Sequence, residues 1–329
     1  MATVALTGAT GFVGGHMVGA LLAKGHKVRA LVRERGDAPR LPRGADGTIA
    51  CEVVVGDSAD PAAAADLVAG ADACINLVGI IREVRRLGRT FQRAHVETPR
   101  VLTGACAAKG VRRFLHMSAM NARDVGVSEY QHTKFEGERI VRRSGLDWTI
   151  FRPSMIMGEG SEFLAMAKGW MSGHAQPWVF IPYFTGGRED TRVPLGGVTP
   201  TDPVVAPVDV RDVCAAFVRA MDEPRSVGEV YNLCGPEAMS MPAMLKFMRD
   251  NTPGAMRGKP VWGIPADAAA TQAMVAGALG LGQMLPFDAG MARMAAEDTV
   301  ADTTKAREDL GWSPRPFTRT YREYAGEGH

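Results

Sequence analysis

Three side chains in the middle of the sequence have the types and spacing needed for acid–base chemistry on an alcohol or a carbonyl group. Tyr130 and Lys134 form a Y-x-x-x-K pair, and Ser118 precedes them. Residues four apart lie on one face of a helix, so we expect the Lys134 ammonium beside the Tyr130 phenol. A nearby cation favours phenolate, so Lys134 is expected to lower the pKa of Tyr130 and to fit it for proton transfer near neutral pH. Ser118 is expected to donate a hydrogen bond to the substrate oxygen.

These side chains need elements that hold them together and a partner that carries the hydride. The pair lies at the start of a charged helix predicted over residues 130–144, and Ser118 directly follows a strand predicted over residues 113–117. With a nicotinamide nearby, the three groups predict removal of a proton from an alcohol as hydride leaves, or the reverse reaction. Because Y-x-x-x-K pairs often arise by chance, this prediction depends on a nucleotide site elsewhere in the chain.

The N-terminal residues predict that nucleotide site. Three glycines are spaced G-x-x-G-x-x-G between a short apolar strand ending at Thr7 and a helix predicted over residues 12–24, and a second strand follows over 27–32. Glycine tolerates positive φ and lets a diphosphate approach the backbone, while the helix directs its first N–H groups at that diphosphate. We therefore predict a dinucleotide-binding turn formed by Gly8, Thr10, Gly11, Phe12, Val13 and Gly14.

The end of the second strand indicates which nucleotide is bound. Proteins that bind NAD usually carry Asp or Glu there, to accept hydrogen bonds from the ribose hydroxyls. This chain has Val32 followed by Arg33, whose planar guanidinium suits the oxygens of a 2′-phosphate. We therefore favour NADP(H) over NAD(H). The alternative is that Arg33 is a solvated surface charge, with Glu34 partly offsetting its attraction for phosphate.

Further cofactor contacts are expected where later predicted strands end. Asp57 is placed to hydrogen-bond an adenine amino group, and Gly79 gives the cofactor room to pass. The complete set of these later contacts is Asp57, Ser58, Leu77, Val78, Gly79, Tyr130, Lys134 and Pro153. A basic cluster between Arg82 and Arg93 is expected to be a solvated loop, with contact to an anionic substrate or to the cofactor phosphates as the alternative.

Alternating strands and helices predict the fold class. Residues 1–155 are expected to form an α/β domain with a Rossmann-type, doubly wound parallel sheet, to which residues 205–235 return. Residues 156–204, rich in Gly, Pro and aromatic side chains, and the Met-rich residues 236–329 are expected to form a smaller, mixed C-terminal lobe that binds substrate. Its aromatic side chains are expected to wall an apolar substrate pocket or to pack the core of the lobe: Trp170, Trp178, Phe180 and Tyr183.

The amino-acid composition limits which kinds of partner, such as nucleic acid, metal ions or membranes, the protein is expected to bind. The formal net charge of +2 gives no indication of nucleic acid, and the seven histidines lack metal-ligand spacing, so we predict no metal. Five scattered cysteines without a C-x-x-C pair favour reduced thiols and a cytoplasmic location. Residues 268–287 contain no charged side chain; we favour a packed helical segment over contact with a membrane surface. The oligomeric state stays open.

The order of these motifs resembles the extended short-chain dehydrogenase/reductase superfamily, which includes the NAD-dependent epimerases and dehydratases. The motifs are T-G-A-T-G-F-V-G-G, Gly56-Asp57, Asn76-Leu77-Val78-Gly79, Ser118, Tyr130-x-x-x-Lys134, Arg152-Pro153-Ser154 and a late Leu-Gly-Trp-x-Pro. Three segments resemble the atypical branch related to the nucleotide-binding accessory subunit of respiratory complex I: 76–83, 90–97 and 114–119. One departure is Thr98-Pro99, where relatives usually have Gly-Thr.

The resemblance implies a Rossmann domain, tightly bound NADP(H) and a smaller lobe over the nicotinamide. It carries Ser118, Tyr130 and Lys134 onto the catalytic positions of the family, with Lys134 contacting the nicotinamide ribose. We therefore predict an NADP(H)-binding oxidoreductase that acts by hydride transfer on a small carbonyl or alcohol substrate, with an apolar substrate as one option. Two alternatives remain: a nucleotide-sugar epimerase or dehydratase with a tightly held cofactor, and a non-catalytic NADP(H)-binding subunit or assembly factor of a respiratory complex.

Overall fold

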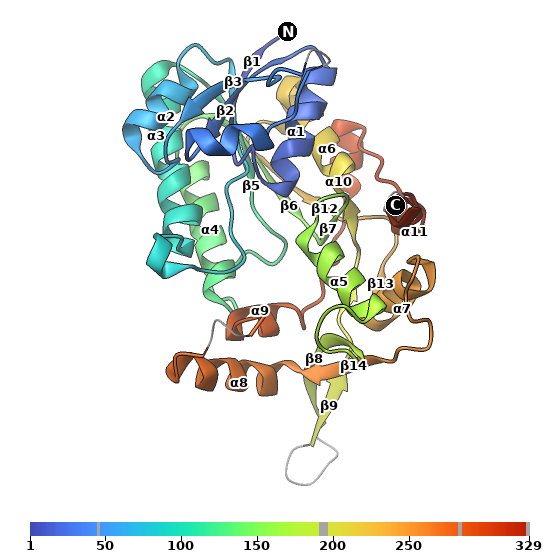
Figure 1. Ribbon diagram of the computed structural model, residues 1–329. Helices are drawn as coiled ribbons and strands as arrows, with labels where there is room; N and C mark the ends of the chain where they lie inside the picture. The colour runs from blue at the N-terminus through green and yellow to red at the C-terminus, as the bar shows by residue number, and fades with distance from the viewer. Residues whose placement is uncertain (45–46, 191–196, 282–284, 327–329) are drawn as a thin grey trace.

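A parallel sheet forms the centre of the computed structural model, which describes residues 1–44, 47–190, 197–281 and 285–326 (Figure 1). Its strand order is β12-β6-β5-β4-β1-β2-β3, and the paired strands run parallel. The strands are β1 (Thr3–Thr7), β2 (Lys27–Val32), β3 (Glu52–Val55), β4 (Ala73–Asn76), β5 (Arg113–Met117), β6 (Asp147–Pro153) and β12 (Glu229–Leu233). This is the doubly wound α/β arrangement that the alternating pattern predicts.

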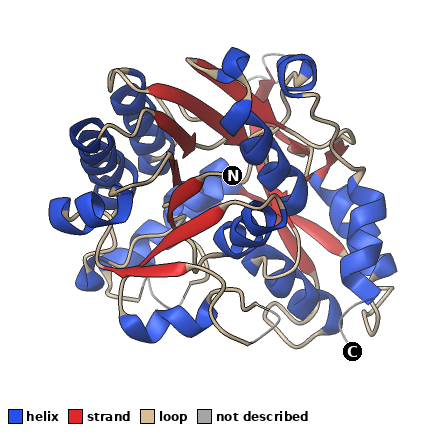
Figure 2. Ribbon diagram, turned by 90° about the horizontal axis from the view of Figure 1, so that it is seen from above, coloured by secondary structure: helices blue, strands red, loops and turns tan. Residues whose placement is uncertain are grey.

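Helices cover both faces of this sheet, as the view from above shows (Figure 2). In β1, Val4 and Leu6 pack into one core while Ala5 packs into the other, so the strand is buried on both sides. The first face carries α1 (Phe12–Ala23), α6 (Val210–Asp222) and α10 (Thr304–Leu310), and the second carries α2 (Pro61–Val68), α3 (Thr98–Lys109) and α4 (Glu129–Arg142).

The C-terminal half of the chain contributes to the sheet and also forms a smaller lobe. Strand β12 pairs with β6, so part of residues 205–235 lies in the central sheet, while Ala306, Leu310 and Trp312 pack into its first core. The predicted domain boundaries themselves stay a prediction. Two short pairs join these parts: β7 (Ile156–Met157) with β11 (Val208–Asp209), and β10 (Val204–Val205) with β13 (Met239–Ser240).

The smaller lobe has its own sheet and core. The sheet consists of β8 (Ile181–Asp190), β9 (Gly197–Thr201) and β14 (Val261–Pro265), and the helices are α5 (Glu162–Ser172), α7 (Met241–Asn251), α8 (Ala266–Ala278), α9 (Ala289–Met294) and α11 (Phe317–Gly326). Trp170 packs in the core of this lobe, whereas Trp178 is 58% exposed. Of these two aromatic side chains, only Trp170 therefore packs the lobe core.

The uncharged segment 268–287 lies mostly on α8 and the turn after it. Ala269, Ala270 and Ala273 form the buried face of α8, which packs beside α9. Residues 282–284 lie outside the described part of the chain. Among the described residues, no helix has the length and apolar character needed to cross a membrane. Contact of this segment with a membrane surface stays a prediction.

The glycine turn is formed by close backbone approach between β1 and α1. Gly8 has φ +76°, which favours glycine, and its carbonyl accepts a hydrogen bond from the Gly11 amide at 3.0 Å. A Cβ on Gly14 would lie 2.0 Å from the Gly8 carbonyl oxygen. The first turn of α1 contains no acidic side chain. Its free amides and positive dipole end therefore suit a phosphate group.

Gly14→Ala is expected to lower the free energy of unfolding by about 1–3 kcal/mol, because overpacking at the Gly8 carbonyl forces β1 and α1 apart. Gly19→Ala provides the matched control, because Gly19 lies on the same helix and a Cβ added to it would meet nothing within 4 Å. The control is expected to gain about 0.5–1 kcal/mol. Chemical denaturation of both variants measures the difference, and equal stabilities would contradict the proposed close approach.

Candidate nucleotide-binding and active site

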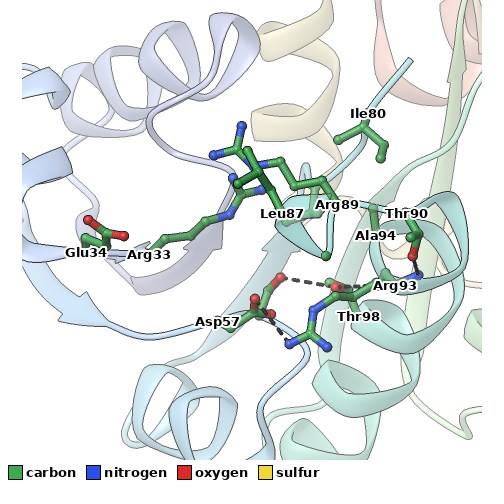
Figure 3. A pocket seen from close by; sticks show the side chains of 13 residues that line it. Arg33, Glu34, Asp57, Ile80, Leu87, Arg89, Thr90, Arg93, Ala94 and Thr98 are labelled. Carbon is green, nitrogen blue, oxygen red and sulfur yellow. Dashed lines mark hydrogen bonds and ion pairs between the residues drawn. The ribbon is translucent and has the colours of Figure 1, made fainter. Parts of the chain in front are cut away.

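A cavity of about 400 Å³ lies beyond the carboxyl ends of β2, β3 and β4 (Figure 3). Ligands of doubly wound sheets bind at this edge. Its lining combines three basic side chains with acidic, hydroxyl and apolar groups: Arg33, Glu34, Asp57, Ser58, Val78, Ile80, Leu87, Gly88, Arg89, Thr90, Arg93, Ala94 and Thr98. The predicted residues Arg33, Asp57, Ser58 and Val78 therefore lie together, and the size suits part of a nucleotide.

Two of the three arginines in this cavity keep their charge available. Arg93 pairs with Asp57 at 3.3 Å and with Glu97 at 3.9 Å. Within the described part of the chain, Arg33 and Arg89 have no carboxylate partner, and Figure 3 shows both side chains extending into the pocket. Arg89 was missed as a single residue by sequence reasoning. The basic cluster was its only signal, and one of the two interpretations of that cluster was contact with phosphate.

A hairpin-like loop brings Arg89 over the cavity. The Val84 amide donates to the Arg89 carbonyl at 2.8 Å, and the Arg89 amide returns a bond to the Val84 carbonyl at 3.3 Å. Gly88, at φ +64°, allows the reversal between them. Residues 80–90, after β4, therefore form a folded loop, here called the strap, whose Arg89 end lines the same pocket as Arg33. They are not a loose basic segment.

The remaining predicted cofactor residues occupy the turn and the ends of strands. Val13 is buried on α1, and the Phe12 ring packs against His16 with centroids 5.7 Å apart. Leu77 is buried beneath the turn, because a Cβ on Gly8 would meet its carbonyl carbon at 3.0 Å. Thr10 lies in the turn itself, and Pro153 is buried at the end of β6. Their contacts with a nucleotide stay predictions.

Tyr130 and Lys134 lie in the first two turns of α4, as their spacing predicts. The helix begins after Ser128, whose hydroxyl accepts a hydrogen bond from the Gln131 amide at 3.3 Å. The Lys134 ammonium is buried and donates to the Met117 carbonyl at 3.2 Å. A Cβ on Gly79 would lie 2.9 Å from the Lys134 Nζ, so the segment after β4 closes over this lysine.

Burial changes the pKa values of both residues. Removal from water lowers the pKa of Lys134 to about 8, although the charge of Glu138 acts in the other direction. Burial also raises the pKa of Tyr130 to about 12. The expected lowering of the Tyr130 pKa is therefore wrong for this structure, because desolvation disfavours the phenolate.

Ser118 is buried and bonded to an acidic side chain. Its hydroxyl donates to the Glu138 Oε1 at 2.6 Å. Arg152 donates to the two Glu138 oxygens, at 2.7 Å from Nε and 2.7 Å from Nη2. Glu138 is fully buried, so this bidentate pair satisfies a charge that water does not reach. The predicted donation from Ser118 to a substrate stays a prediction and requires the hydroxyl to leave Glu138.

His95 was not predicted as a site residue, yet it contacts Tyr130, the Thr133 side chain and the backbone of Ile80. Its Nε2 accepts a hydrogen bond from the Ile80 amide at 3.2 Å, which leaves Nδ1 to donate to the Thr133 hydroxyl at 3.0 Å. Its ring meets the Tyr130 ring edge-on, with centroids 5.2 Å apart. Burial and the Lys134 charge hold the pKa of His95 well below its usual value. His95 is therefore a neutral side chain that hydrogen-bonds Ile80 and Thr133 and packs against Tyr130.

A π-helical turn (Gln92–Glu97) carries His95 and leads into α3. Pro99 lacks an amide hydrogen and its ring crowds the carbonyl four residues earlier, which is that of His95. That carbonyl instead faces α4, where a Cβ on Gly137 would lie 2.2 Å from it. The Thr98-Pro99 departure noted in the sequence therefore coincides with a local change in helix geometry.

Among the described residues, one surface group meets the distance needed for a metal site: Asp124, His132 and Glu136 offer ligand atoms within 4.8 Å of one another. The His132 Nδ1, however, lies 2.8 Å from the Asp124 carbonyl oxygen and so donates its hydrogen to that carbonyl. A nitrogen that carries hydrogen is not available to a cation, so Nε2 is the remaining ligand atom of His132. Exposed acidic groups of this kind are common without a metal, and nothing further indicates one here.

The turn, the parallel sheet and the cavity beyond its strands define an NAD(P)H-binding protein of the extended short-chain dehydrogenase/reductase type. A family model described as NAD(P)H-binding matches residues 8–169. The chain is also 30% identical over 327 residues to (4-alkanoyl-5-oxo-2,5-dihydrofuran-3-yl)methyl phosphate reductase of Streptomyces griseus, covering 98% of each protein. The chain therefore belongs to this NAD(P)H-binding family.

Two further relatives match over shorter regions. Ceramide reductase of Caulobacter vibrioides is 38% identical over 157 residues, which cover 48% of this chain and 47% of that protein. Subunit 9 of the NADH dehydrogenase 1 alpha subcomplex of Mus musculus is 29% identical over 174 residues, which cover 53% of this chain and 41% of that protein. The chain thus spans about half the length of these relatives. The second supports the resemblance to the complex I branch.

A solved structure supports the fold independently. The NADPH-dependent quinone oxidoreductase of Escherichia coli, complexed with NADPH, superimposes with a TM-score of 0.67. The match covers 97% of this chain and 99% of that one at 20% identity. This likeness shows the fold, while the relatives place the chain in an NAD(P)H-binding family that includes proteins named as reductases.

The buried Lys134 predicts a measurable pH dependence of stability. With a folded pKa of about 8 against an ordinary value of 10.5, the unfolded chain binds more protons between these pH values, so the destabilisation caused by this buried ammonium decreases as pH rises. Lys134→Met removes the desolvation cost. It is expected to exceed the wild-type protein in stability by roughly 3 kcal/mol at pH 7, with a smaller difference at pH 10.

Denaturant unfolding at pH 7, 8.5 and 10 measures this difference, and stopping at pH 10 avoids the opposing titration of Tyr130, whose pKa is raised to about 12. Lys109→Met is the control, because Lys109 is exposed at the end of α3. A stability difference that stays constant with pH would show that the Lys134 ammonium is not desolvated.

Proposed function

We propose that the protein is an NADP(H)-dependent oxidoreductase that reduces a carbonyl group or oxidises the corresponding alcohol. The observation that carries this proposal is the closure of Gly79 over Lys134, with Tyr130 one turn earlier on α4. The glycine turn and the arginine-lined cavity fit the diphosphate and adenosine parts of a dinucleotide. Cofactor groups are expected to contact Gly11, Arg33, Val78, Gly79 and Lys134.

A bound nicotinamide would supply or accept the hydride. Tyr130 would hold a proton at its phenol oxygen and give it to the substrate oxygen during reduction, or receive it during oxidation. Lys134, with a pKa of about 8, carries most of its charge at neutral pH and would hydrogen-bond the ribose while favouring the phenolate. The high pKa of Tyr130 makes the phenol the resting form, which carries the proton that reduction of a carbonyl would consume.

The relatives' names suggest a substrate class. Two relatives are named as reductases, one of ceramide and one of an alkanoyl furanyl methyl phosphate. Both names describe molecules with an alkyl or acyl part and a polar part. We propose a substrate of this kind for this chain, with an apolar tail that the smaller lobe would shelter from water.

Tyr130→Phe is expected to lower kcat at least about 100-fold, because the variant keeps the ring but cannot transfer a proton. NADPH affinity is expected to stay within about twofold of wild type, because Phe keeps the ring contact with His95. Turnover of alkyl ketones or aldehydes with NADPH and fluorescence titration of NADPH measure the two effects. Undiminished turnover would contradict the mechanism.

The same measurements separate the other candidate functions. A non-catalytic NADP(H)-binding subunit is favoured by two observations: the Ser118 hydroxyl is bonded to Glu138, and one relative is a complex I subunit. It predicts nucleotide-dependent thermal stability without turnover in either form. An epimerase or dehydratase predicts retained cofactor, turnover that depends on Tyr130 and no net consumption of NADPH.

NADP(H) preference is proposed from Arg33 and Arg89, the two cavity arginines without carboxylate partners among the described residues. Guanidinium groups bind phosphate through paired, charge-assisted hydrogen bonds. A 2′-phosphate between them would neutralise a concentration of positive charge. An NAD ribose offers only hydroxyls, which these side chains bind less strongly.

Arg33→Ala and Arg89→Ala are each expected to weaken NADPH binding roughly 10- to 100-fold, since a hydrogen bond to a charged group contributes about 1.5–3 kcal/mol. NADH affinity is expected to change little. Arg86→Ala is the matched control, because Arg86 lies exposed on the same strap and outside the cavity lining. Isothermal titration calorimetry with NADPH and with NADH measures these affinities. Equal losses of affinity for NADH and NADPH would contradict the assigned preference for NADP(H).

A further inference from the structure

Glu297 joins the smaller lobe to the segment that leads into the first turn of α4. This residue follows α9, and its carboxylate accepts hydrogen bonds from three side chains more than 160 positions earlier in the chain. Gln131 Nε2 lies 2.5 Å from Oε2, Asn121 Nδ2 lies 3.5 Å from the same oxygen, and Arg123 pairs with Oε1. The Glu297 carboxylate thus accepts hydrogen bonds from side chains at both ends of the segment 121–131.

The chemistry of these donors requires an acceptor at this position. Gln131 is buried, and its Oε1 already accepts the Val127 amide at 2.8 Å, so its Nε2 must donate elsewhere. Asn121 has φ +62°, in the left-handed region that few residues other than glycine adopt. Its Nδ2 also donates to the Asp298 carbonyl at 2.8 Å. A carboxylate accepts several donors at once and offers none, which suits this position.

Glu297 is itself held firmly by the lobe. The neighbouring Asp298 carboxylate accepts the Val204 amide at 2.7 Å, and the Thr299 amide donates to the Val204 carbonyl at 2.8 Å. The Ala206 amide then donates to the Thr299 carbonyl at 3.3 Å. Glu297 therefore extends from a backbone region fixed on the lobe side, so its bonds restrain the segment 121–131.

That segment connects the predicted catalytic residues. Ser118 lies before it, and Tyr130 lies inside it, directly before Gln131. Part of the segment is open to solvent, since Val125 is 89% exposed. Restraint of Gln131 through Glu297 therefore fixes the turn of α4 from which the Tyr130 phenol projects.

We propose that Glu297 is a positioning residue that orders residues 121–131 and so places Tyr130 for proton transfer. The proposal rests on the proposed oxidoreductase function, because it concerns the same tyrosine. Glu297 acts through Gln131 and Arg123 and does not touch the reacting atoms. Loss of the Glu297 carboxylate leaves the buried side-chain amide of Gln131 and the guanidinium of Arg123 without this acceptor. It also releases the segment 121–131 from the lobe.

Glu297→Gln tests this at almost constant shape. Its amide presents one acceptor in place of two charged oxygens, so kcat is expected to fall about 10- to 100-fold, the size of effect that small misplacement of a catalytic group produces. NADPH affinity is expected to stay within about twofold of wild type, since the glycine turn and cavity are untouched. Glu297→Asp keeps the charge with a shorter reach, and an intermediate kcat is expected.

Hydrogen exchange supplies a readout that does not need turnover. The amides of Val127 and Gln131 are expected to exchange at least tenfold faster in Glu297→Gln than in wild type, while amides of β1 and β4 stay protected. Glu308→Gln is the control, because Glu308 is exposed on α10 and is expected to change neither kcat nor exchange. A double variant with Arg123→Met is expected to lose less than the product of the two single effects.

The outcomes distinguish this proposal from the proposed function. If wild type turns over and Glu297→Gln keeps full kcat, the positioning role is overturned and the oxidoreductase function stands. Unchanged exchange at Val127 and Gln131 also overturns it. If neither form turns over any carbonyl, the oxidoreductase function fails, and the exchange rates still show whether Glu297 orders the segment. A uniform loss of thermal stability with unchanged kcat and unchanged local exchange would mark a merely structural contact.

Discussion

The cost of keeping the Lys134 ammonium away from water governs the arrangement of the site. A buried cation is tolerated when acceptors and an opposite charge surround it. Lys134 has the Met117 carbonyl as an acceptor and the Glu138 charge nearby, and Glu138 is in turn paired with Arg152. The end of β5, the middle of α4 and the end of β6 are therefore connected through two charged side chains of α4, Lys134 and Glu138. The remaining shift in the pKa of Lys134, to about 8, shows that the compensation is partial.

Tyr130 shows why a short motif predicts position better than chemistry. The spacing of Tyr130 and Lys134 specifies a common helix face, and the structure confirms that placement on α4. The pKa of Tyr130 depends on how much water the surrounding side chains exclude. Phe91 and His95, both from the segment before α3, pack against its ring and contribute to that exclusion. The resulting desolvation raises the pKa of Tyr130, and no spacing rule in the sequence contains this effect.

Local patterns predicted the parts of the site that depend on neighbours in sequence. The glycine turn, the start of α4 and the alternation of the sheet follow from backbone conformation and from hydrophobic periodicity. Arg89, Glu138 and Glu297 were not predicted, because each acquires its meaning from a residue distant in sequence: Arg33 in the same cavity, Arg152 on β6, and Gln131 on α4. Sequence shows such residues only as ordinary surface charges. Burial and partner identity distinguish them, and both are properties of the folded chain.

The site also depends on contacts between the larger, sheet-containing part and the smaller lobe. In one contact, Arg82 in the strap donates to the Leu285 carbonyl at 2.9 Å. In another, the Glu297 carboxylate of the lobe accepts hydrogen bonds from Arg123 and Gln131. The strap that carries Arg82 also brings Arg89 to the nucleotide cavity. If the proposed nucleotide contact of Arg89 holds, binding would restrain the same strap that contacts the lobe, so cofactor binding and lobe position would be linked through one segment of chain. Such a linkage would be reciprocal, since any gain in nucleotide affinity from an ordered strap would reappear as a more firmly held lobe.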